Sequence, residues 1–279
     1  MRLLKGDNLK INAAFYGSGE KTILCVHGIT ANCRAWDIPA SSLSSDYQVV
    51  AMDLRGRGGS DKPDTGYSPE HHIKDMIALL NDLGIDKICL MGHSLGAFIS
   101  LVFAAQHPER LEKLVIVDGA GDLSPDQMDQ VFVGIKPALD RLEKTFSSET
   151  DYLDQMKAAP WIQPWLPNIE AYYRHEIESL ESGVRTNINP MHIKEESANV
   201  RKIDCATLYE KVQCPTLILR ATQGLLSRYD MLLPEDAVER MVEKIPDARR
   251  FDVKGTNHYG ILFQPHTERD SALKEFLGG

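Results

Sequence analysis

The chain has 279 residues, of which 43% are hydrophobic and 25% are charged. This balance is typical of a globular protein, and it excludes intrinsic disorder, collagen and a disulfide-dense mini-scaffold. The length predicts one α/β domain, or one domain with an insert. With 31 basic and 40 acidic residues the net charge is −9, which makes the chain a poor candidate for binding nucleic-acid phosphates.

Two further features concern the cellular location. No apolar stretch approaches the roughly 20 residues of a membrane helix. The N-terminal segment 1–7 becomes charged again after two leucines, so we expect no signal peptide. The cysteines form no C-x-x-C pair; they are Cys25, Cys33, Cys89, Cys205 and Cys214. We therefore expect a cytoplasmic protein with free thiols, without disulfides and without a zinc site.

Short apolar runs alternate with helical patterns along the chain. Continuous β-branched runs predict strands that are covered on both faces, and they lie at 22–26, 48–53, 87–91, 113–118, 216–220 and 248–253. Helical patterns lie at 69–83, 95–106, 234–244 and 265–277. Such alternation predicts an α/β fold with a mostly parallel twisted sheet and helices on both faces. Residues 9–16 add an edge strand or hairpin.

One interval breaks this alternation. From residue 119 to about 213 no buried-strand run appears, and the roughly ninety residues are rich in helix formers. We predict an inserted helical cap at 122–212 on a core made of residues 1–121 and 213–279. Open α/β sheets bind ligands at the carboxyl ends of their strands, so the insert is expected to form a lid there. The alternative is an insert that only packs against the core.

The segment Gly92-His93-Ser94-Leu95-Gly96 follows an apolar strand and opens a helical pattern. A G-x-S-x-G sequence in this context places its serine at a tight strand-to-helix turn, where the small flanking residues relieve crowding. The turn holds the hydroxyl clear of the sheet, at the positive end of a helix dipole. We therefore predict Ser94 as a nucleophile; the alternative is an ordinary helix-capping serine.

Four segments together resemble the α/β-hydrolase superfamily, in particular its capped serine esterases and C–C hydrolases. They are His27-Gly28 after the first core strand, the D-x-R-G-x-G-x-S loop at 53–60, the elbow at 92–96, and Asn257-His258-Tyr259 after the last strand. The resemblance runs from about residue 22 to the C-terminus, and it implies an α/β-hydrolase fold with an inserted cap. We expect Arg55 and Arg57 to hold the 53–60 loop in place rather than to bind an anion.

A serine hydroxyl needs a neighbouring base, and that base is nearly always a histidine. Among nine histidines, only His258 lies in a loop that carries Gly and Asn, directly after the last strand and before the last helix. The family's chain order is serine, acid, histidine, and His258 fits the last place. We predict it as the base; the alternative is a solvated loop histidine. His93 is expected to point away from the side that Ser94 faces.

The acid departs from the commoner family pattern, R-G-x-x-D after the strand at 216–220. This chain has Gly224 where that aspartate would be, and Asp230 follows in a longer loop. Asp118 ends the strand that follows the nucleophile helix, and some family members carry their acid there. We favour Asp118 as a buried acceptor that holds the imidazole in one tautomer. Asp230 is the alternative acid, and Asp122 is a weaker one.

The oxyanion that forms on attack needs two N–H donors. We expect one from the backbone of Leu95, the residue after the nucleophile, and the resemblance implies the other from the backbone of Ile29. Four aromatic residues are candidates for the substrate pocket, although the tryptophans suit packing within the cap or core equally well; they are Trp36, Trp161, Trp165 and Tyr259.

A Ser–His–Asp site transfers an acyl group to water, so we expect hydrolysis of a carboxylic ester of small to medium size. Amide or C–C bond hydrolysis at the same site is the alternative, and a ligand receptor or regulatory protein of this fold is the non-enzyme alternative. Dehalogenases and epoxide hydrolases of similar fold carry Asp at the elbow, so Ser94 argues against both. We expect a small-molecule substrate, no cofactor, no metal and no membrane or nucleic-acid partner; a homodimer is left open.

Overall fold

The computed structural model describes all 279 residues and contains an eight-stranded sheet. Its strand order is β1-β2-β4-β3-β5-β6-β9-β10. The bounds are β1 Arg2–Lys5, β2 Lys10–Tyr16, β3 Lys21–Val26, β4 Tyr47–Met52, β5 Ile88–His93, β6 Leu111–Val117, β9 Thr216–Ala221 and β10 Ala248–Val253. All pairs from β4 to β10 are parallel, whereas β1–β2 and β2–β4 are antiparallel. The predicted α/β fold with its N-terminal hairpin is confirmed.

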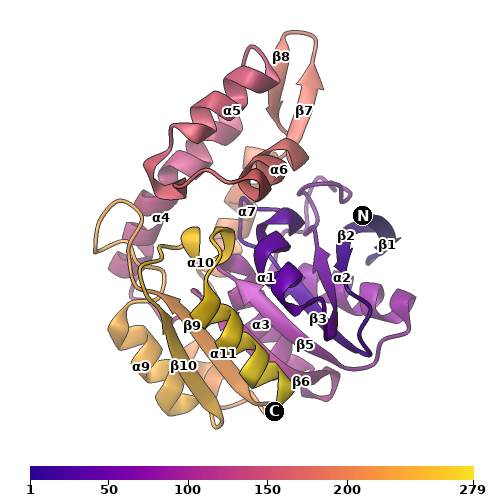
Figure 1. Cartoon of the computed structure of the whole chain (residues 1–279), viewed down its shortest axis with the longest axis vertical. Helices are drawn as coiled ribbons and strands as arrows, with labels where there is room; N and C mark the ends of the chain where they lie inside the picture. Colours follow the sequence, from indigo (N-terminus) through magenta and orange to yellow (C-terminus); the bar gives the residue numbers. More distant parts are fainter.

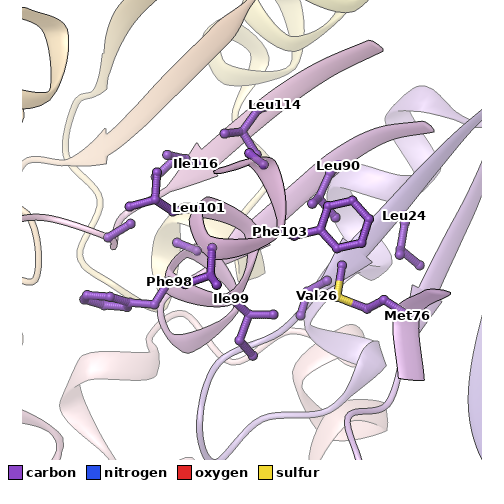
Figure 2. Packing of buried hydrophobic residues seen from close by; sticks show 14 of the residues in the cluster. Leu24, Val26, Met76, Leu90, Phe98, Ile99, Leu101, Phe103, Leu114 and Ile116 are labelled. Carbon is purple, nitrogen blue, oxygen red and sulfur yellow. The ribbon is translucent and has the colours of Figure 1, made fainter. Parts of the chain in front are cut away.

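Helices cover both faces of this sheet (Figure 1). One core cluster contains α2 (Pro69–Leu83), α3 (Leu95–Gln106) and α9 (Glu235–Lys244) residues, and the other contains α1 (Asp37–Leu43) and α11 (Thr267–Gly278) residues. Strand β3 illustrates why the core strands appear in the sequence as continuous apolar runs. Leu24 and Val26 belong to the first cluster, which Figure 2 shows, while Ile23 and Cys25 belong to the second. Successive side chains of a strand face opposite sides, so a strand buried on both faces has no polar alternation.

The segment between β6 and β9 holds α4 (Pro125–Asp140), η3 (Arg141–Glu143), α5 (Glu149–Lys157), η4 (Pro160–Ile162), α6 (Pro167–His175), α7 (Pro190–Val200) and α8 (Ala206–Tyr209). It also contains a hairpin that the sequence did not indicate, β7 (Ile177–Leu180) and β8 (Gly183–Thr186). In Figure 1 the elements from α5 to β8 project beyond one end of the sheet, and we call the segment 122–212 the cap. No helix of the chain is both long enough and apolar enough to cross a bilayer.

Four short elements near the strand ends were also not predicted. They are η1 (Cys33–Trp36), α1 (Asp37–Leu43), η2 (Pro108–Arg110) and α10 (Gly260–Phe263). Each has two turns or fewer, which is too short to show a helical period in the sequence. Helix α10 contacts both η1 and α1, so the segments that follow β3 and β10 lie together.

Candidate active site

Ser94 lies between β5 and α3 and has a positive φ, with φ 56° and ψ −119°. A side chain at either flanking glycine would collide with backbone: a Cβ at Gly92 would lie 2.2 Å from the Gly96 oxygen, and a Cβ at Gly96 would lie 2.0 Å from the Val26 oxygen. The Ser94 N–H donates to Val117 O at 3.1 Å, which fixes the turn to the end of β6. The glycines of the G-x-S-x-G sequence are therefore required by the close packing of β3, β5 and α3.

His258 and Asp118 meet across two strand ends. The Nδ1 atom of His258 lies 2.7 Å from Oδ2 of Asp118, and both side chains are buried. The other oxygen, Oδ1, accepts from the Ala221 N–H at 3.1 Å. With Nδ1 held by a carboxylate, Nε2 is the imidazole nitrogen left to accept a proton. His258 lines the same pocket as Ser94. No hydrogen bond joins Ser94 Oγ to His258 in this structure.

Asp230 has a different environment. Its carboxylate accepts three backbone N–H bonds within its own loop, from Leu225 at 2.8 Å, Leu226 at 2.8 Å and Ser227 at 3.0 Å. It is buried and makes no bond to His258. The Asp230 carboxylate thus stabilises the loop after β9 by hydrogen bonds within that loop. Asp122, the weaker alternative acid, accepts at its carbonyl from Arg240 at 2.6 Å and does not bond His258 either.

His93 is a site residue that the sequence analysis placed wrongly. Instead of pointing away, it is buried against His258, with the two rings stacked at a centroid distance of 4.4 Å. Its Nε2 lies 2.9 Å from the His258 carbonyl oxygen, to which it donates. Burial, together with the neighbouring His258, holds the pKa of His93 well below its usual value. His93 is therefore neutral at pH 7, and it positions His258 without placing a second charge beside it.

The loop after β3 passes directly beside Ser94: a Cβ at Gly28 would lie 3.2 Å from the Ser94 Cβ. His27 orients this loop. Its Nε2 accepts from the Leu54 N–H at 3.0 Å, so Nδ1 carries the proton and donates to Gly28 O at 2.8 Å. Burial lowers the pKa of His27 to about 4, which keeps this arrangement neutral. Because a peptide is planar, fixing the Gly28 carbonyl also fixes the opposite direction of the Ile29 N–H.

Leu95 is the first residue of α3, so its N–H has no partner within the helix. Leu95 begins α3 directly after Ser94, and Ile29 belongs to the loop after β3, so the two N–H groups come from two different elements. Ile29 lines the pocket that contains Ser94 and His258. These are the two groups that the sequence analysis named as donors to an oxyanion.

The pocket above Ser94 is mainly apolar. Eight of its 13 lining residues are hydrophobic, and none is Lys, Arg, Asp or Glu. Tyr259 is part of the lining, as are Ile135 and Tyr172 from the cap and Leu262 and Phe263 from α10. The tryptophans lie elsewhere, and the structure explains each position by packing. Trp36 is fully buried in the core, Trp161 lines a separate cavity within the cap, and Trp165 stacks on Tyr173 at 5.6 Å.

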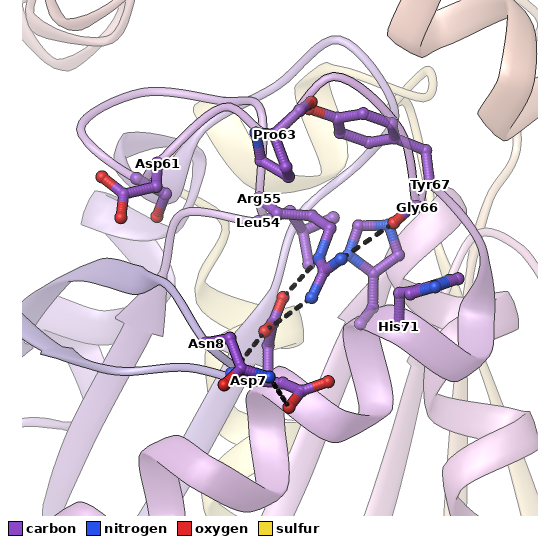
Figure 3. A network of polar contacts seen from close by, with 12 residues as sticks. Asp7, Asn8, Leu54, Arg55, Asp61, Pro63, Gly66, Tyr67 and His71 are labelled. Carbon is purple, nitrogen blue, oxygen red and sulfur yellow. Dashed lines mark hydrogen bonds and ion pairs between the residues drawn. The ribbon is translucent and has the colours of Figure 1, made fainter.

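The loop after β4 is fixed by its two arginines. Arg55 forms a bidentate ion pair with Asp75, in which Nε and Nη2 lie 2.7 and 2.8 Å from the two carboxylate oxygens. Arg55 also donates to Gly66 O (Figure 3). Arg57 is fully buried and donates from Nε to Ile29 O at 3.1 Å. As expected, both arginines hold the loop, and Arg57 in addition contacts the loop beside Ser94.

Arg57 also connects that loop to the cap. Its Nη2 lies 2.8 Å from Glu196 Oε2 on α7, and His72 Nε2 lies 2.8 Å from the same oxygen. The three side chains are completely inaccessible to solvent. Burial alone would raise the pKa of Glu196, but the nearby His72 and Arg57 lower it to about 2. No local sequence pattern indicates this network, because its members lie on elements far apart in the chain.

We expect Glu196→Gln to destabilise the fold by about 3 kcal/mol at pH 7, because it leaves the Arg57 guanidinium buried without its counter-charge. The folded-state pKa of Glu196 is depressed, so its contribution is present above pH ~4.5 and is lost as the pH falls toward about 2. Urea unfolding at pH 7 and at pH 3 measures both effects. Glu239→Gln, on the exposed face of α9, is the matched control and should leave the curve unchanged.

Comparisons with known proteins identify hydrolases of the same fold. Residues 21–149 match the family model described as alpha/beta hydrolase fold. A 2-(acetamidomethylene)succinate hydrolase from Mesorhizobium japonicum is 28% identical over 257 residues, covering 90% of this chain and 86% of that protein. The crystal structure of E-2-(acetamidomethylene)succinate hydrolase superposes with a TM-score of 0.85 at 24% identity, covering 100% and 98% of the two chains.

A thermophilic esterase from Thermogutta terrifontis has a TM-score of 0.73 at 22% identity, covering 99% of this chain and 97% of that one. At these identities the two solved structures establish the fold. The family match over residues 21–149 and the relative from Mesorhizobium japonicum indicate the class of activity, which is hydrolysis. We conclude that the chain has the α/β-hydrolase fold and is a hydrolase, with serine at the nucleophile position of its elbow.

Proposed function

We propose that this protein hydrolyses carboxylic esters with a short, uncharged acyl group, using Ser94 as nucleophile, His258 as base and Asp118 as the acid that orients His258. The observation that carries the proposal is the 2.7 Å contact of His258 Nδ1 with Asp118, beside an apolar pocket that also holds Ser94. This contact leaves Nε2 of His258 to exchange a proton inside that pocket.

The reaction follows from these positions. Ser94 Oγ forms a bond to the ester carbonyl carbon while His258 Nε2 takes its proton, and the carbonyl π electrons move to the oxygen. The N–H groups of Leu95 and Ile29 stabilise that oxyanion. When the C–O bond to the alcohol breaks, His258 returns the proton to the leaving oxygen. Water, activated by the same imidazole, then attacks the acyl-enzyme and releases the carboxylic acid and free Ser94.

The pocket supports a small neutral substrate. Its cavity volume is only about 30 Å³, well below the roughly 300–1,000 Å³ of ligand pockets, so only a small acyl group fits inside it. A substrate carboxylate buried there would lie against apolar side chains without a cationic partner, which is costly. Arg141, the buried arginine of η3, is already paired with Glu176 at 2.9 Å and donates to Thr30 O at 2.9 Å. Its guanidinium donors are therefore already used and are not free to bind a substrate.

The proposal is tested with p-nitrophenyl esters of increasing acyl length. We expect acetate and butyrate to give the highest kcat/KM, and octanoate to fall by about tenfold or more, because the additional methylenes exceed the pocket. Pre-steady-state mixing should release a burst of about one p-nitrophenol per chain, and an organophosphonate should label Ser94. A flat dependence on chain length would contradict the pocket assignment. Absence of both burst and label would favour the non-catalytic receptor or regulatory role.

Amide hydrolysis is the second candidate, and the full-length relative favours it, because its name identifies a substrate with an acetamido group. The same triad serves both bonds, since His258 can protonate a leaving nitrogen as well as an oxygen. A succinate, however, carries two carboxylates, and the pocket of this chain has no cationic lining residue. Comparing p-nitrophenyl acetate with p-nitroacetanilide distinguishes the two. We expect ester turnover to exceed anilide turnover.

A further inference from the structure

Three side chains of the kinds that bind metal ions meet outside the active-site pocket. They are Cys33 in η1, Asp53 directly after β4, and His175, the last residue of cap helix α6. Their ligand atoms all lie within 4.8 Å of one another. A thiol, an imidazole and a carboxylate are the donors that zinc takes in proteins. Because the three residues are far apart in the chain, no spacing rule could reveal them, and the sequence predicted no zinc site.

One of the two measured separations already suits a tetrahedral ion, and the other is close to it. Cys33 Sγ lies 3.7 Å from His175 Nε2, and His175 Nε2 lies 2.8 Å from Asp53 Oδ2. Bonds of about 2.3 Å to sulfur and about 2.0–2.1 Å to nitrogen or oxygen place S and N about 3.5 Å apart, and N and O about 3.3 Å apart. The sulfur–nitrogen pair is already spaced for an ion. The His175–Asp53 pair must open by about 0.5 Å.

The three ligands differ in how firmly they are held. Asp53 is fixed, because Oδ1 accepts from the Cys33 N–H at 2.7 Å and Oδ2 accepts from Asn12 Nδ2 at 2.8 Å. His175 has 18% of its side chain exposed, so it can adjust and provides an entry route for an ion. The thioether of Met1 lies 3.9 Å from Cys33 Sγ, which adds a second sulfur beside the cluster.

We propose that Cys33, Asp53 and His175 form a zinc-binding site that links cap helix α6 to the core. On binding, Zn²⁺ displaces the His175 Nε2 proton that faces Asp53; this proton leaves to solvent, the neutral imidazole carries its one N–H on Nδ1, and Nε2 becomes the ligand. The Cys33 thiol gives its proton to solvent and coordinates as thiolate, as zinc-bound cysteines do. The site takes no part in the chemistry at Ser94. Its effect is to join two segments, α6 and the η1–β4 region, that otherwise touch through hydrogen bonds and packing.

The test uses tag-free full-length protein that has been treated with EDTA and dialysed. Titration with ZnCl₂ against a chromophoric chelator should give one tight equivalent per chain. With Co²⁺ as the probe, a thiolate-to-cobalt charge-transfer band and tetrahedral d–d bands should appear. At free Zn²⁺ about 100-fold above the dissociation constant, the unfolding equilibrium constant should fall about 100-fold.

Cys33→Ser and His175→Gln should each lose the tight equivalent and the charge-transfer band. The matched controls are Cys214→Ser and His107→Gln, the same changes away from the cluster, and both should bind Zn²⁺ as the unaltered protein does. His175→Gln lies at a partly exposed position, so it provides a folded test protein if Cys33→Ser does not fold. Retention of tight, stoichiometric binding by His175→Gln overturns the assignment, and so does its absence from the unaltered protein. Neither result depends on whether the protein hydrolyses esters.

Discussion

Ser94→Ala should reduce kcat for p-nitrophenyl acetate by about 10⁶-fold, because it removes the hydroxyl that forms the acyl-enzyme. The residual rate would come from the N–H groups of Leu95 and Ile29, which still stabilise the oxyanion when water attacks. The burst and the phosphonate label should disappear together with turnover. Alanine keeps a Cβ at the φ 56° position, so the turn is strained to the same degree and the fold should be retained.

The matched control is Ser100→Ala, which makes the same chemical change in helix α3, six residues after Ser94. The Ser100 hydroxyl is completely buried and has no hydrogen-bond partner, so its removal leaves the site untouched. Circular dichroism and thermal unfolding of both variants separate loss of chemistry from loss of structure. If Ser94→Ala retained turnover comparable to Ser100→Ala, the nucleophile would have to be another residue, and the proposed mechanism would fail.

The sequence predicted the parts of the fold that have a local signature. The strands were recognised because their apolar runs are continuous, and β10 was predicted at residues 248–253 as the structure has it. The elbow was recognised because β5, the glycines and α3 follow one another directly. In contrast, β7 and β8 have four residues each, and only two of these eight residues are buried, so they show no apolar run.

What could not be predicted depends on distances between remote segments. Trp36 was a reasonable pocket residue, because a large aromatic side chain near the oxyanion loop suits either a pocket or a core, and only packing decides between them. His93 was expected to point away, since nothing local indicates that the loop after β10 packs against it. Glu196 reads as one of two acidic residues on a polar helix, although it is completely buried with Arg57 and His72.

The acid is the point at which the chain offered two candidates, and a pair of variants distinguishes them. Asp118→Asn should reduce kcat by about 10³–10⁴-fold. The asparagine can keep the contact from the Ala221 N–H through its amide oxygen. It then presents an NH₂ group to His258 Nδ1, which must become an acceptor. The proton moves to Nε2, and the imidazole can no longer take the proton from Ser94.

Asp230→Asn is the matched control, since it makes the same change in another buried aspartate. It should alter kcat by no more than about threefold, because the N–H donors of Asp230 belong to residues 225–227 and none of its partners is in the pocket. Its effect should instead be a loss of about 1–3 kcal/mol in unfolding free energy, as charge-assisted bonds to three N–H groups are weakened. If kcat fell with Asp230→Asn and not with Asp118→Asn, His258 would have to rotate toward the β9 loop during turnover, and the acid would be reassigned.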